Sequence, residues 1–312
     1  MSPPGQVSCP RPAPDTPLAP LVLPPADSVE TRPGPGCCPA LTWAERRALL
    51  GQAGDRPAAP ADPDERIRYR WLLGHQVTFC LWRSHSQLLR RIAADRAPSA
   101  RAMELAARLH HTYAVLLLYT ASCSPERYAA TVRTDMTSCD PAFSGTWARD
   151  HQPLPGLVRR VRLLHPGAPS RPLRAAAVLT RQVHLAVAEK LVPGGRSLLQ
   201  QAGQRPQAQP TPAEQDRYDV FFGVERAPVC EHSVARQLAC RVNRILVDLA
   251  EHGLHDLDHA PAALRAAHPV ELRLLERHAP LLLRRLVPDA PPGGAVPGQA
   301  GGVLLSSTRG VR

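Results

Sequence analysis

The chain has 312 residues, among them 35 prolines and 20 glycines, and a formal net charge of +11. Its 38 basic residues include one lysine, Lys190, and the arginines are scattered singly along helical patterns. Nucleic-acid partners are disfavoured, because there is no basic block and no interleaving of basic and aromatic residues. No apolar run reaches the roughly 18 residues of a membrane-spanning helix, and no secretory segment follows the N-terminus. We therefore expect a cytoplasmic protein without membrane contact.

The cysteines and glycines exclude further classes of site. Eight cysteines occur without a Cys-x-x-Cys or Cys-x-x-Cys-His motif, which disfavours zinc fingers and the usual covalent attachment of c-type haem. Phosphate-binding loops and dinucleotide-binding glycine fingerprints are missing as well. The sequence thus disfavours a nucleotide-dependent enzyme.

Proline is concentrated at the two ends of the chain. Residues 1–38 contain repeated Pro-Pro and Pro-x-Pro steps, and residues 288–312 are rich in glycine and proline. Such segments bury too little apolar surface to offset the entropy of ordering, so both are predicted to be disordered tails. Residues 39–287 are predicted to form one helical domain, large enough to bury a cofactor. Its first helix, capped by Thr42, is expected over residues 41–51 as a lid or clasp.

The longest helical pattern covers residues 64–92. At about 100° per residue, one narrow face of this helix collects the following side chains: Ile67, Trp71, His75, Thr78, Trp82, His85 and Leu89. A histidine between two tryptophans is either satisfied inside a core or held where a flat apolar ligand and a proton transfer meet. The helix alone leaves both alternatives open.

A second long helix is predicted after this one. Ser99 is its N-cap, and it runs through Tyr119, antiparallel to the first helix. His110 and His111 are adjacent in it and cannot share a face. We expect one of them in solvent and neither as a metal ligand.

A short helix and a long loop follow. Ser124-Pro125 begins the helix, which ends near Met136 with Arg133 close to its end. Residues 137–156 form an irregular loop with two aromatic residues around a Ser-Gly pair. Long ordered loops often carry binding or catalytic residues, although a plain surface connection is the alternative.

Residues 171–192 are predicted to form a helix that ends at a Pro-Gly-Gly turn. His184 lies on one face of it, flanked mostly by small side chains: Ala177, Thr180, Arg181 and Ala188. Small neighbours leave room for a flat macrocycle to approach an imidazole, which is a common axial ligand of haem iron. A core or surface histidine is the bland alternative.

The remaining elements are an exposed loop over residues 198–216, a short apolar segment over 218–224, and helices over 229–250 and 269–286. His232 in the third of these elements competes with His184 as a ligand, but its surroundings contain more arginine. A rival divalent-metal site is suggested by clustered side chains near residue 255: His252, His255, Asp256, Asp258 and His259. Gly253 and the Ala-Pro step after this cluster indicate a solvated helix end instead.

The order of these elements resembles the histidine-ligated, haem-dependent aromatic oxygenases, which include tryptophan 2,3-dioxygenase and the bacterial haem-dependent tyrosine hydroxylases. His75-Gln76, with Leu81-Trp82 after it, has the spacing of the dioxygenase helix. A long helix, a Ser-Pro-capped short helix with an arginine, and the Ser144-Gly145 loop then follow in family order. The resemblance covers residues 64–150.

Two departures favour the tyrosine-hydroxylase branch. The dioxygenases continue Ser-Gly-Phe-Gln-Ser, whereas Thr146-Trp147 follows the Ser-Gly pair here, and Arg133 is about four residues farther from it. The dioxygenase Gly-Thr-Gly-Gly-Ser loop is absent, with residues 193–197 as the nearest counterpart. The similar tyrosine hydroxylases occur in actinobacterial secondary-metabolite and antibiotic biosynthesis.

The resemblance implies an all-α haem b enzyme that hydroxylates L-tyrosine at ring position 3 to give L-DOPA, with peroxide or dioxygen as oxidant. His184 is implied as the axial ligand, since the family places it before a glycine turn, and His232 is the alternative. His75 is implied as a distal acid/base and Arg133 as the anchor of the substrate carboxylate. The implied pocket lining is Trp82, Phe79, Phe143, Ser144 and Trp147.

Several alternatives stay open at this point. The substrate can be tyrosine, a methylated tyrosine or tryptophan, and the protein a monomer or a homodimer. A non-enzymatic helical interaction protein with proline-rich ends is the alternative from a different class.

Overall fold

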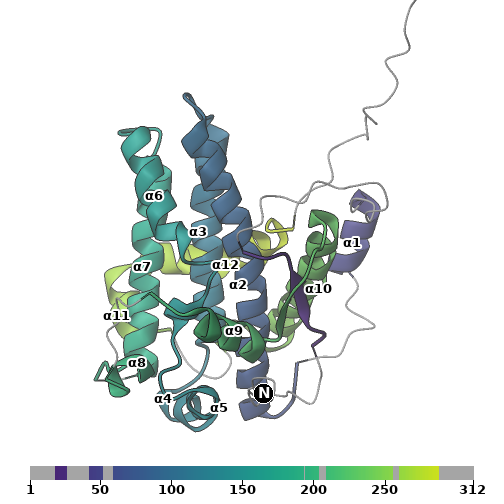
Figure 1. Ribbon diagram of the computed structural model, residues 1–312, viewed down its shortest axis with the longest axis vertical. Coiled ribbons are helices and arrows are strands. Elements are labelled where there is room, and N and C mark those ends of the chain that lie inside the picture. Colours follow the sequence, from purple (N-terminus) through teal and green to yellow (C-terminus); the bar gives the residue numbers. More distant parts are fainter. Residues whose placement is uncertain are drawn as a thin grey trace, which may run out of the picture.

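A computed structural model describes residues 18–26, 42–51, 59–192, 194–203, 209–255 and 260–287. These residues are predominantly helical, with one two-stranded sheet, so the prediction of an all-α fold is confirmed (Figure 1). Most of the two predicted tails, residues 1–17, 27–38 and 288–312, lies outside the described residues, as do Asp256, Asp258 and His259. No helix in the described ranges is long and apolar enough to cross a membrane.

The central helix is α2 (Pro63–Ala94), which begins one residue before the predicted range of 64–92 and ends two residues after it. Its N-cap is Asp62, whose carboxylate accepts hydrogen bonds from the next two free backbone N–H groups, both at 2.9 Å. In its middle, a Cβ atom at Gly74 would come within 2.3 Å of the Thr120 methyl group. Only glycine therefore allows the neighbouring helix to approach this closely, one residue before His75.

That neighbour is α3 (Ala100–Thr120), which begins at the predicted cap Ser99 and runs antiparallel to α2. Two more helices pack beside this pair: α7 (Arg171–Leu191) lies along α3, and α6 (Pro153–Leu164) lies against α2. No helix was predicted at α6, because the prolines in its first turn resemble a loop but are well tolerated at a helix start. The long loop is thereby shortened to residues 140–152.

The predicted short helix contains an irregular turn. It consists of α4 (Pro125–Tyr128), a π-helical turn (Ala129–Arg133) and α5 (Thr134–Cys139). A π turn inserts one extra residue into a helix and is common at functional sites. Here it ends at Arg133, which places this arginine differently from an uninterrupted helix.

Residues 198–221 differ from the predicted exposed loop and apolar segment. They include two helices, α8 (Leu198–Gln201) and α9 (Pro212–Phe221). Both begin with a capping box, at Ser197 and at Thr211, a local signal that outweighs the Gln- and Pro-rich composition.

The prediction of disorder is wrong for residues 18–26. Strand β1 (Leu21–Leu23) pairs in parallel with β2 (Val224–Arg226), and Leu21 and Leu23 are fully buried. The side chain of Gln237 donates to and accepts from the backbone of Val22, at 2.9 and 2.8 Å. A three-residue strand inside a proline-rich segment is stabilised by partners two hundred residues away, which local composition does not reveal.

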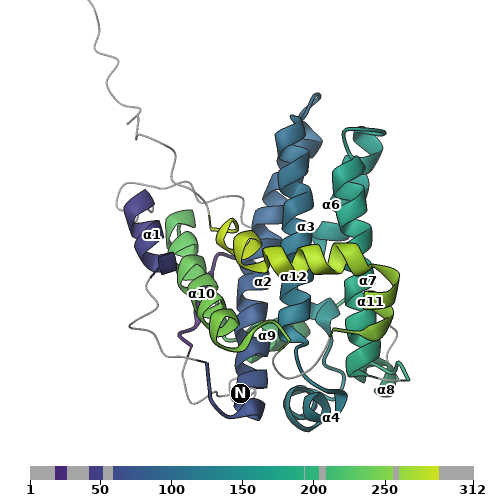
Figure 2. The same cartoon turned by 180° about the vertical axis from the view of Figure 1, so that it is seen from behind.

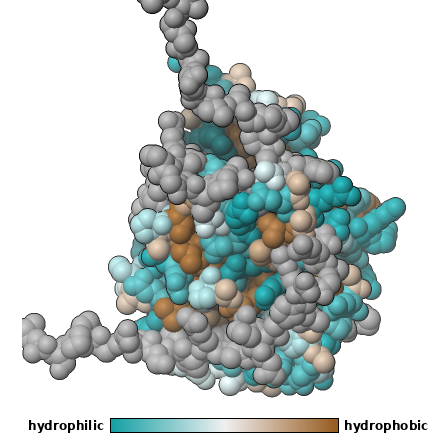
Figure 3. Space-filling view, turned by 90° about the vertical axis from the view of Figure 1, so that its right-hand side faces the viewer, coloured by the Kyte–Doolittle hydropathy of each residue, from teal (hydrophilic) through white to brown (hydrophobic). Residues whose placement is uncertain are grey.

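The C-terminal helices are α10 (Glu231–His252), α11 (Ala262–Ala267) and α12 (Pro269–Arg284). Helix α12 packs against α3 and α10, and it crosses in front of α3 in the view from behind (Figure 2). Helix α1 (Trp43–Gly51) packs against α10, and Arg46 donates to the Arg284 and Val287 carbonyl groups, at 2.9 and 3.1 Å. It acts as a clasp on these helices. The face that carries α1 and α10 is mostly hydrophilic, with small hydrophobic patches (Figure 3).

Candidate active site

A cavity of about 470 Å³ lies among α2, α3, α7, α8, α9 and the loop over residues 140–152. This volume is within the range of ligand and cofactor sites. Six of the residues predicted for the site line it: His75, Trp82, Arg133, Phe143, Ser144 and His184. Further lining residues that the sequence did not single out for the site include Tyr113, Tyr128, His151, Tyr218 and Phe222.

The cavity has two ends, spread along α2. Trp71 and Trp82 both line it and are eleven residues apart, which corresponds to about 16 Å along the helix axis. We call the end near Trp71 the Arg133 end, which is formed by Trp71, His75, Tyr128 and Arg133. The other is the His184 end, formed by Trp82, Tyr113, His151 and His184.

His75 is held between aromatic rings at the Arg133 end. Its ring stacks on Phe222, with centroids 4.3 Å apart and planes 15° apart, and lies 4.4 Å from the Trp71 ring. Its Nδ1 atom is 2.7 Å from the carbonyl oxygen of Trp71, which can only accept, so Nδ1 carries the hydrogen in this pair. Burial lowers the pKa of His75 to about 4. At neutral pH the ring is therefore uncharged, with Nε2 as a free acceptor.

Gln76 fixes the ring that stacks on His75. Its amide nitrogen donates to the carbonyl oxygen of Phe222 at 2.9 Å, and its amide oxygen accepts from Arg241 at 2.8 Å. Gln76 is fully enclosed, with only 1 % of its surface exposed. The adjacent His-Gln pair of the sequence thus has a physical role: the histidine faces the cavity while the glutamine holds the opposite wall.

Arg133 supplies a positive charge at the same end. Its guanidinium donates to the carbonyl oxygen of Arg196 at 3.2 Å, next to the glycine turn, and the side chain is half-buried. Nearby, Tyr128 lies 5.7 Å from the Trp71 ring, and burial raises its pKa to about 12, so the phenol stays protonated. A guanidinium beside neutral aromatic walls can bind a carboxylate through two parallel hydrogen bonds.

The Ser-Gly loop forms part of the wall near Arg133. Ser144 accepts a hydrogen bond from the Thr146 backbone at 3.2 Å and its hydroxyl lies 2.9 Å from the Thr146 hydroxyl. These contacts form the cap of the short turn Gly145–Trp147. Phe143 is buried beside this turn, stacked on Tyr218 with centroids 5.5 Å apart.

The His184 end contains two histidines. Trp82 lies 5.0 Å from the His151 ring and 5.7 Å from Tyr113. Burial, and to a smaller extent proximity to His184, lowers the pKa of His151 to about 4. Both imidazoles are therefore neutral near pH 7, the form that binds metal ions.

His184 lines the cavity from α7. It is an exposed residue, yet the protein around it lowers the pKa of its imidazole. One turn farther along α7, Ala188 lines the cavity with a single methyl group, while buried Val187 closes the wall. A neutral nitrogen donor beside a small residue and an otherwise apolar wall fits a planar iron cofactor.

Two predicted lining residues and the alternative ligand lie elsewhere. Phe79 and Trp147 are 0 and 2 % exposed, and neither borders the cavity in the described part of the chain. Phe79 packs instead behind the wall, against Tyr218 and Phe222. His232 sits at the start of α10, 3.9 Å from Glu231, and does not line the cavity. Phe79 and Trp147 were included because of the family resemblance and His232 as a competing ligand, and a sequence pattern does not give the depth at which a side chain ends.

The rival metal site is not assembled in the residues that can be described. His255 lies 2.8 Å from a carboxylate oxygen of Glu276, in another helix. No group of three or more His, Cys, Asp or Glu side chains capable of holding a metal ion occurs within the described ranges.

His110 and His111 are both half-buried, so neither is the fully solvated residue expected. His110 instead packs on His85, with centroids 4.6 Å apart.

His151 is the lining residue for which the sequence offered least warning. It follows Asp150 in an irregular loop, where no periodicity indicates which way a side chain points. Tyr113 was assigned to the buried face of α3, and Phe222 to an apolar segment. In those two cases burial was foreseen, but a contact with the cavity was not.

Comparison with known proteins gives one match. A family model described as SfmD 3-methyl-L-tyrosine peroxygenase matches residues 23–178. The matched range is half of the chain and contains His75, Arg133, Ser144 and His151, whereas His184 lies just beyond its end. None of the curated proteins matches the chain.

Proposed function

Because the chain belongs to the SfmD 3-methyl-L-tyrosine peroxygenase family, we propose that it uses hydrogen peroxide to hydroxylate the ring of L-tyrosine or of a ring-methylated L-tyrosine. The family is haem-dependent and oxidises aromatic amino acids. With L-tyrosine the product of hydroxylation at position 3 is L-DOPA. Peroxide is the favoured oxidant over dioxygen because the family consists of peroxygenases.

The observation that carries this proposal is the convergence of His75, Arg133 and His184 on one cavity. They come from α2, from the π turn and from α7, and each had a different implied role. A neutral base, a guanidinium and a neutral metal ligand are the groups that ring hydroxylation of an amino acid needs. A scaffold protein has no requirement to bring these three together.

His184 is the residue proposed to hold haem b, with Ala188 and the aromatic walls around the macrocycle. When bound, haem supplies the iron centre at which peroxide is activated to oxidise the ring. The apolar wall excludes water from the reacting atoms, which strengthens the polar interactions made inside.

His75 is proposed to move the proton. Its Nε2 atom is the free acceptor, since Nδ1 donates to the Trp71 carbonyl group. Nε2 can accept a proton from the peroxide and return it to the oxygen that leaves as water, while the other oxygen is transferred to the ring. The overall reaction is balanced: the peroxide and the aromatic C–H group give a phenol and water. Stacking on Phe222 keeps the imidazole in one orientation throughout.

Arg133 is proposed to bind the substrate carboxylate. This anchor would direct the ring away from the Arg133 end, along the cavity and toward His184. Phe143 and Tyr218 offer stacked aromatic surfaces on the way. Orientation of this kind converts an encounter into an intramolecular reaction and is a large source of rate enhancement.

The test is product formation by haem-supplemented protein with hydrogen peroxide. L-tyrosine, 3-methyl-L-tyrosine and L-tryptophan are supplied separately, and products are identified by mass spectrometry. We expect both tyrosines to give a product one oxygen atom heavier, with the ratio of their kcat/KM values identifying the preferred substrate. Cleavage of tryptophan with no oxidation of either tyrosine would contradict the proposal.

A further inference from the structure

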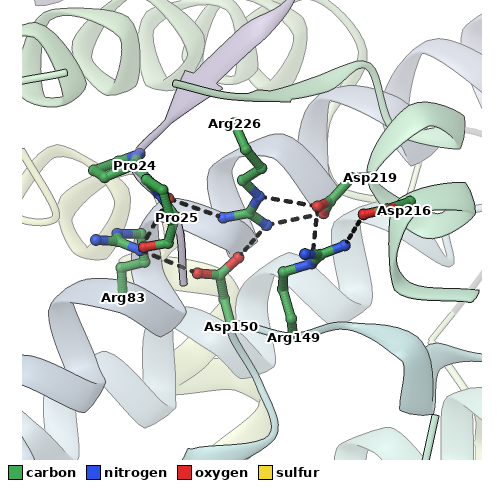
Figure 4. A network of polar contacts seen from close by, with 8 residues as sticks. All are labelled: Pro24, Pro25, Arg83, Arg149, Asp150, Asp216, Asp219 and Arg226. Atoms are coloured by element: carbon green, nitrogen blue, oxygen red, sulfur yellow. Dashed lines mark hydrogen bonds and ion pairs between the residues drawn. The ribbon is translucent and has the colours of Figure 1, made fainter. Parts of the chain in front are cut away.

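Four charged side chains lie directly behind the His184 end of the cavity, two buried carboxylates and two partly buried guanidinium groups. We call Arg83, Asp150, Asp219 and Arg226 the Asp150 network (Figure 4). Arg226 donates to Asp150 at 2.6 Å and to both carboxylate oxygens of Asp219, at 2.8 and 2.9 Å. Arg83 lies 3.5 Å from the other Asp150 oxygen. The side chains of Asp150 and Asp219 are only 1 and 6 % exposed.

The network also reaches the N-terminal segment. Arg83 donates to the carbonyl oxygens of Pro24 and Pro25, at 3.3 and 3.2 Å, and Arg226 donates to that of Pro24 at 3.4 Å. On its outer side, Arg149 pairs with Asp219 at 3.0 Å and with the exposed Asp216. Segments from α2, the loop, α9, β2 and the end of β1 are therefore tied at one point.

Each of three network residues is the sequence neighbour of a residue that lines the cavity. Arg83 follows Trp82, Asp150 precedes His151, and Asp219 follows Tyr218. Neighbours share a peptide bond, so moving a network side chain moves the backbone of the lining residue. Of the three, His151 depends most on this support, because it lies in a turn outside any helix, where its backbone bonds, among the described residues, only to the nearby Ala148 carbonyl and Leu154 N–H groups, both at 3.0 Å.

The charges of the network balance, two guanidinium groups against two carboxylates. Burial raises the pKa of Asp219, and its hydrogen bonds to Arg226 counteract that rise. Loss of the Asp150 carboxylate would remove the negative charge that the partly buried Arg83 and Arg226 share. Breaking a buried ion pair from one side is costly because an uncompensated charge remains, so the surrounding backbone is expected to shift.

We infer that Asp150 is a positioning residue for His151, and that the Asp150 network fixes the wall against which the cofactor lies beside His184. The identity of that ligand as haem rests on the proposed function. The positioning of the wall does not, because it follows from the ion pairs and the burial.

The test compares Asp150→Asn with His151→Ala and with the double variant. Haem affinity is measured by titration of the Soret band, and supporting residues around metal sites typically contribute about 10- to 100-fold. We expect each single variant to lose affinity in this range, and the double variant to lose no more than His151→Ala alone. At saturating haem, the KM for tyrosine should change by less than about twofold in Asp150→Asn, since the Arg133 end is untouched. Full additivity of the two losses would overturn the inference.

The matched control is Asp216→Asn, which removes a carboxylate that is 70 % exposed and pairs with Arg149 at the outer edge. Its haem affinity should stay within about twofold of the parent protein. If Asp150→Asn fails to fold, Arg226→Lys takes its place, since it keeps the charge and loses the two-pronged bond to Asp219.

A readout without haem separates this inference from the proposed function. The indole N–H signal of Trp82 in a proton–nitrogen NMR spectrum reports on the wall directly, because His151 packs on that ring. The signal should shift in Asp150→Asn and stay in place in Asp216→Asn. Soret loss without this shift, or an unshifted Trp82 signal in haem-free protein, would contradict the positioning role. If the parent protein binds no haem but the Trp82 signal still shifts in Asp150→Asn, the proposed cofactor is wrong and the inference stands.

Discussion

At the Arg133 end of the cavity, the polar side chains come from helical turns, and distant residues contact them as well: Arg133 donates to the Arg196 carbonyl group, and His75 stacks on Phe222. His75 bonds to a carbonyl group four residues earlier, and Arg133 is placed by the π turn that contains it. At the His184 end, His151 comes from a loop. The position of this loop depends on ion pairs of Asp150 with Arg83 and Arg226, which are 67 and 76 residues away from Asp150 in the sequence. Helical turns place the polar residues of the Arg133 end, whereas at the His184 end His151 is placed by a loop that long-range ion pairs tie to other segments.

The two ends also differ in charge. The Arg133 end presents a guanidinium, whereas the His184 end presents two histidines whose pKa values are lowered by burial and which are therefore neutral. A charged end suits a carboxylate, and a neutral nitrogen suits an iron ligand. The comparison therefore supports the proposal that substrate recognition and cofactor binding occur at opposite ends of the cavity, and substitutions at each end test this division.

The largest effect is expected at His75. His75→Ala should keep bound haem and still bind tyrosine, but hydroxylation should slow by roughly 10²- to 10⁴-fold, the usual contribution of a general acid/base. Single-turnover measurements with peroxide, alongside a Soret titration, separate the two properties. A variant that hydroxylates tyrosine at the parental rate would reduce His75 to a packing residue.

The next largest effect is expected at Arg133. Arg133→Lys keeps the charge but cannot form two parallel hydrogen bonds to a carboxylate, so KM for tyrosine should rise roughly 10- to 100-fold with little change in haem affinity. Tyramine, which lacks the carboxylate, should be a poor substrate of the parent enzyme. Equal turnover of tyramine and tyrosine would show that Arg133 does not anchor the substrate carboxylate, and it would contradict the division between the two ends.

A smaller effect concerns pH. Because the pKa of His75 is lowered to about 4, its base form is fully present at neutral pH. The part of kcat/KM controlled by His75 should therefore be flat between roughly pH 6 and 8 and fall only toward pH 4. An acidic limb centred near the ordinary histidine value of about 6.5, lost in His75→Ala, would show that the ring is more hydrated than the structure indicates.

The lowered pKa values of the buried histidines predict that acid destabilises the fold. His75, His110 and His151 each have a pKa lowered to about 4 by burial. Between roughly pH 6.5 and 4, the unfolded chain binds protons that the folded chain does not, so the free energy of unfolding should decrease as pH falls through this window. Above about pH 7 these groups contribute no pH dependence. Urea titrations of the haem-free protein at several pH values measure this directly.

The comparison of the two ends also explains what the sequence could predict. His75, Trp82 and Arg133 were found because helical periodicity and capping residues are local signals that survive in a single sequence. His151 was missed because the loop that carries it has no period, and its position depends on Arg226 in a distant strand. For the same reason β1 was assigned to a disordered tail: its partner is β2, and proline-rich composition gives no sign of that pairing.

The central claim is that His184 binds haem at its end of the cavity. The most direct measurement is the visible spectrum of haem-supplemented parent protein, His184→Ala and His232→Ala, each with and without added imidazole. The account predicts a Soret band of bound haem in the parent and in His232→Ala, its loss in His184→Ala, and its recovery there when imidazole fills the space that the side chain left. Retention of the parental spectrum in His184→Ala, with loss in His232→Ala, would transfer the ligand to α10 and contradict the account.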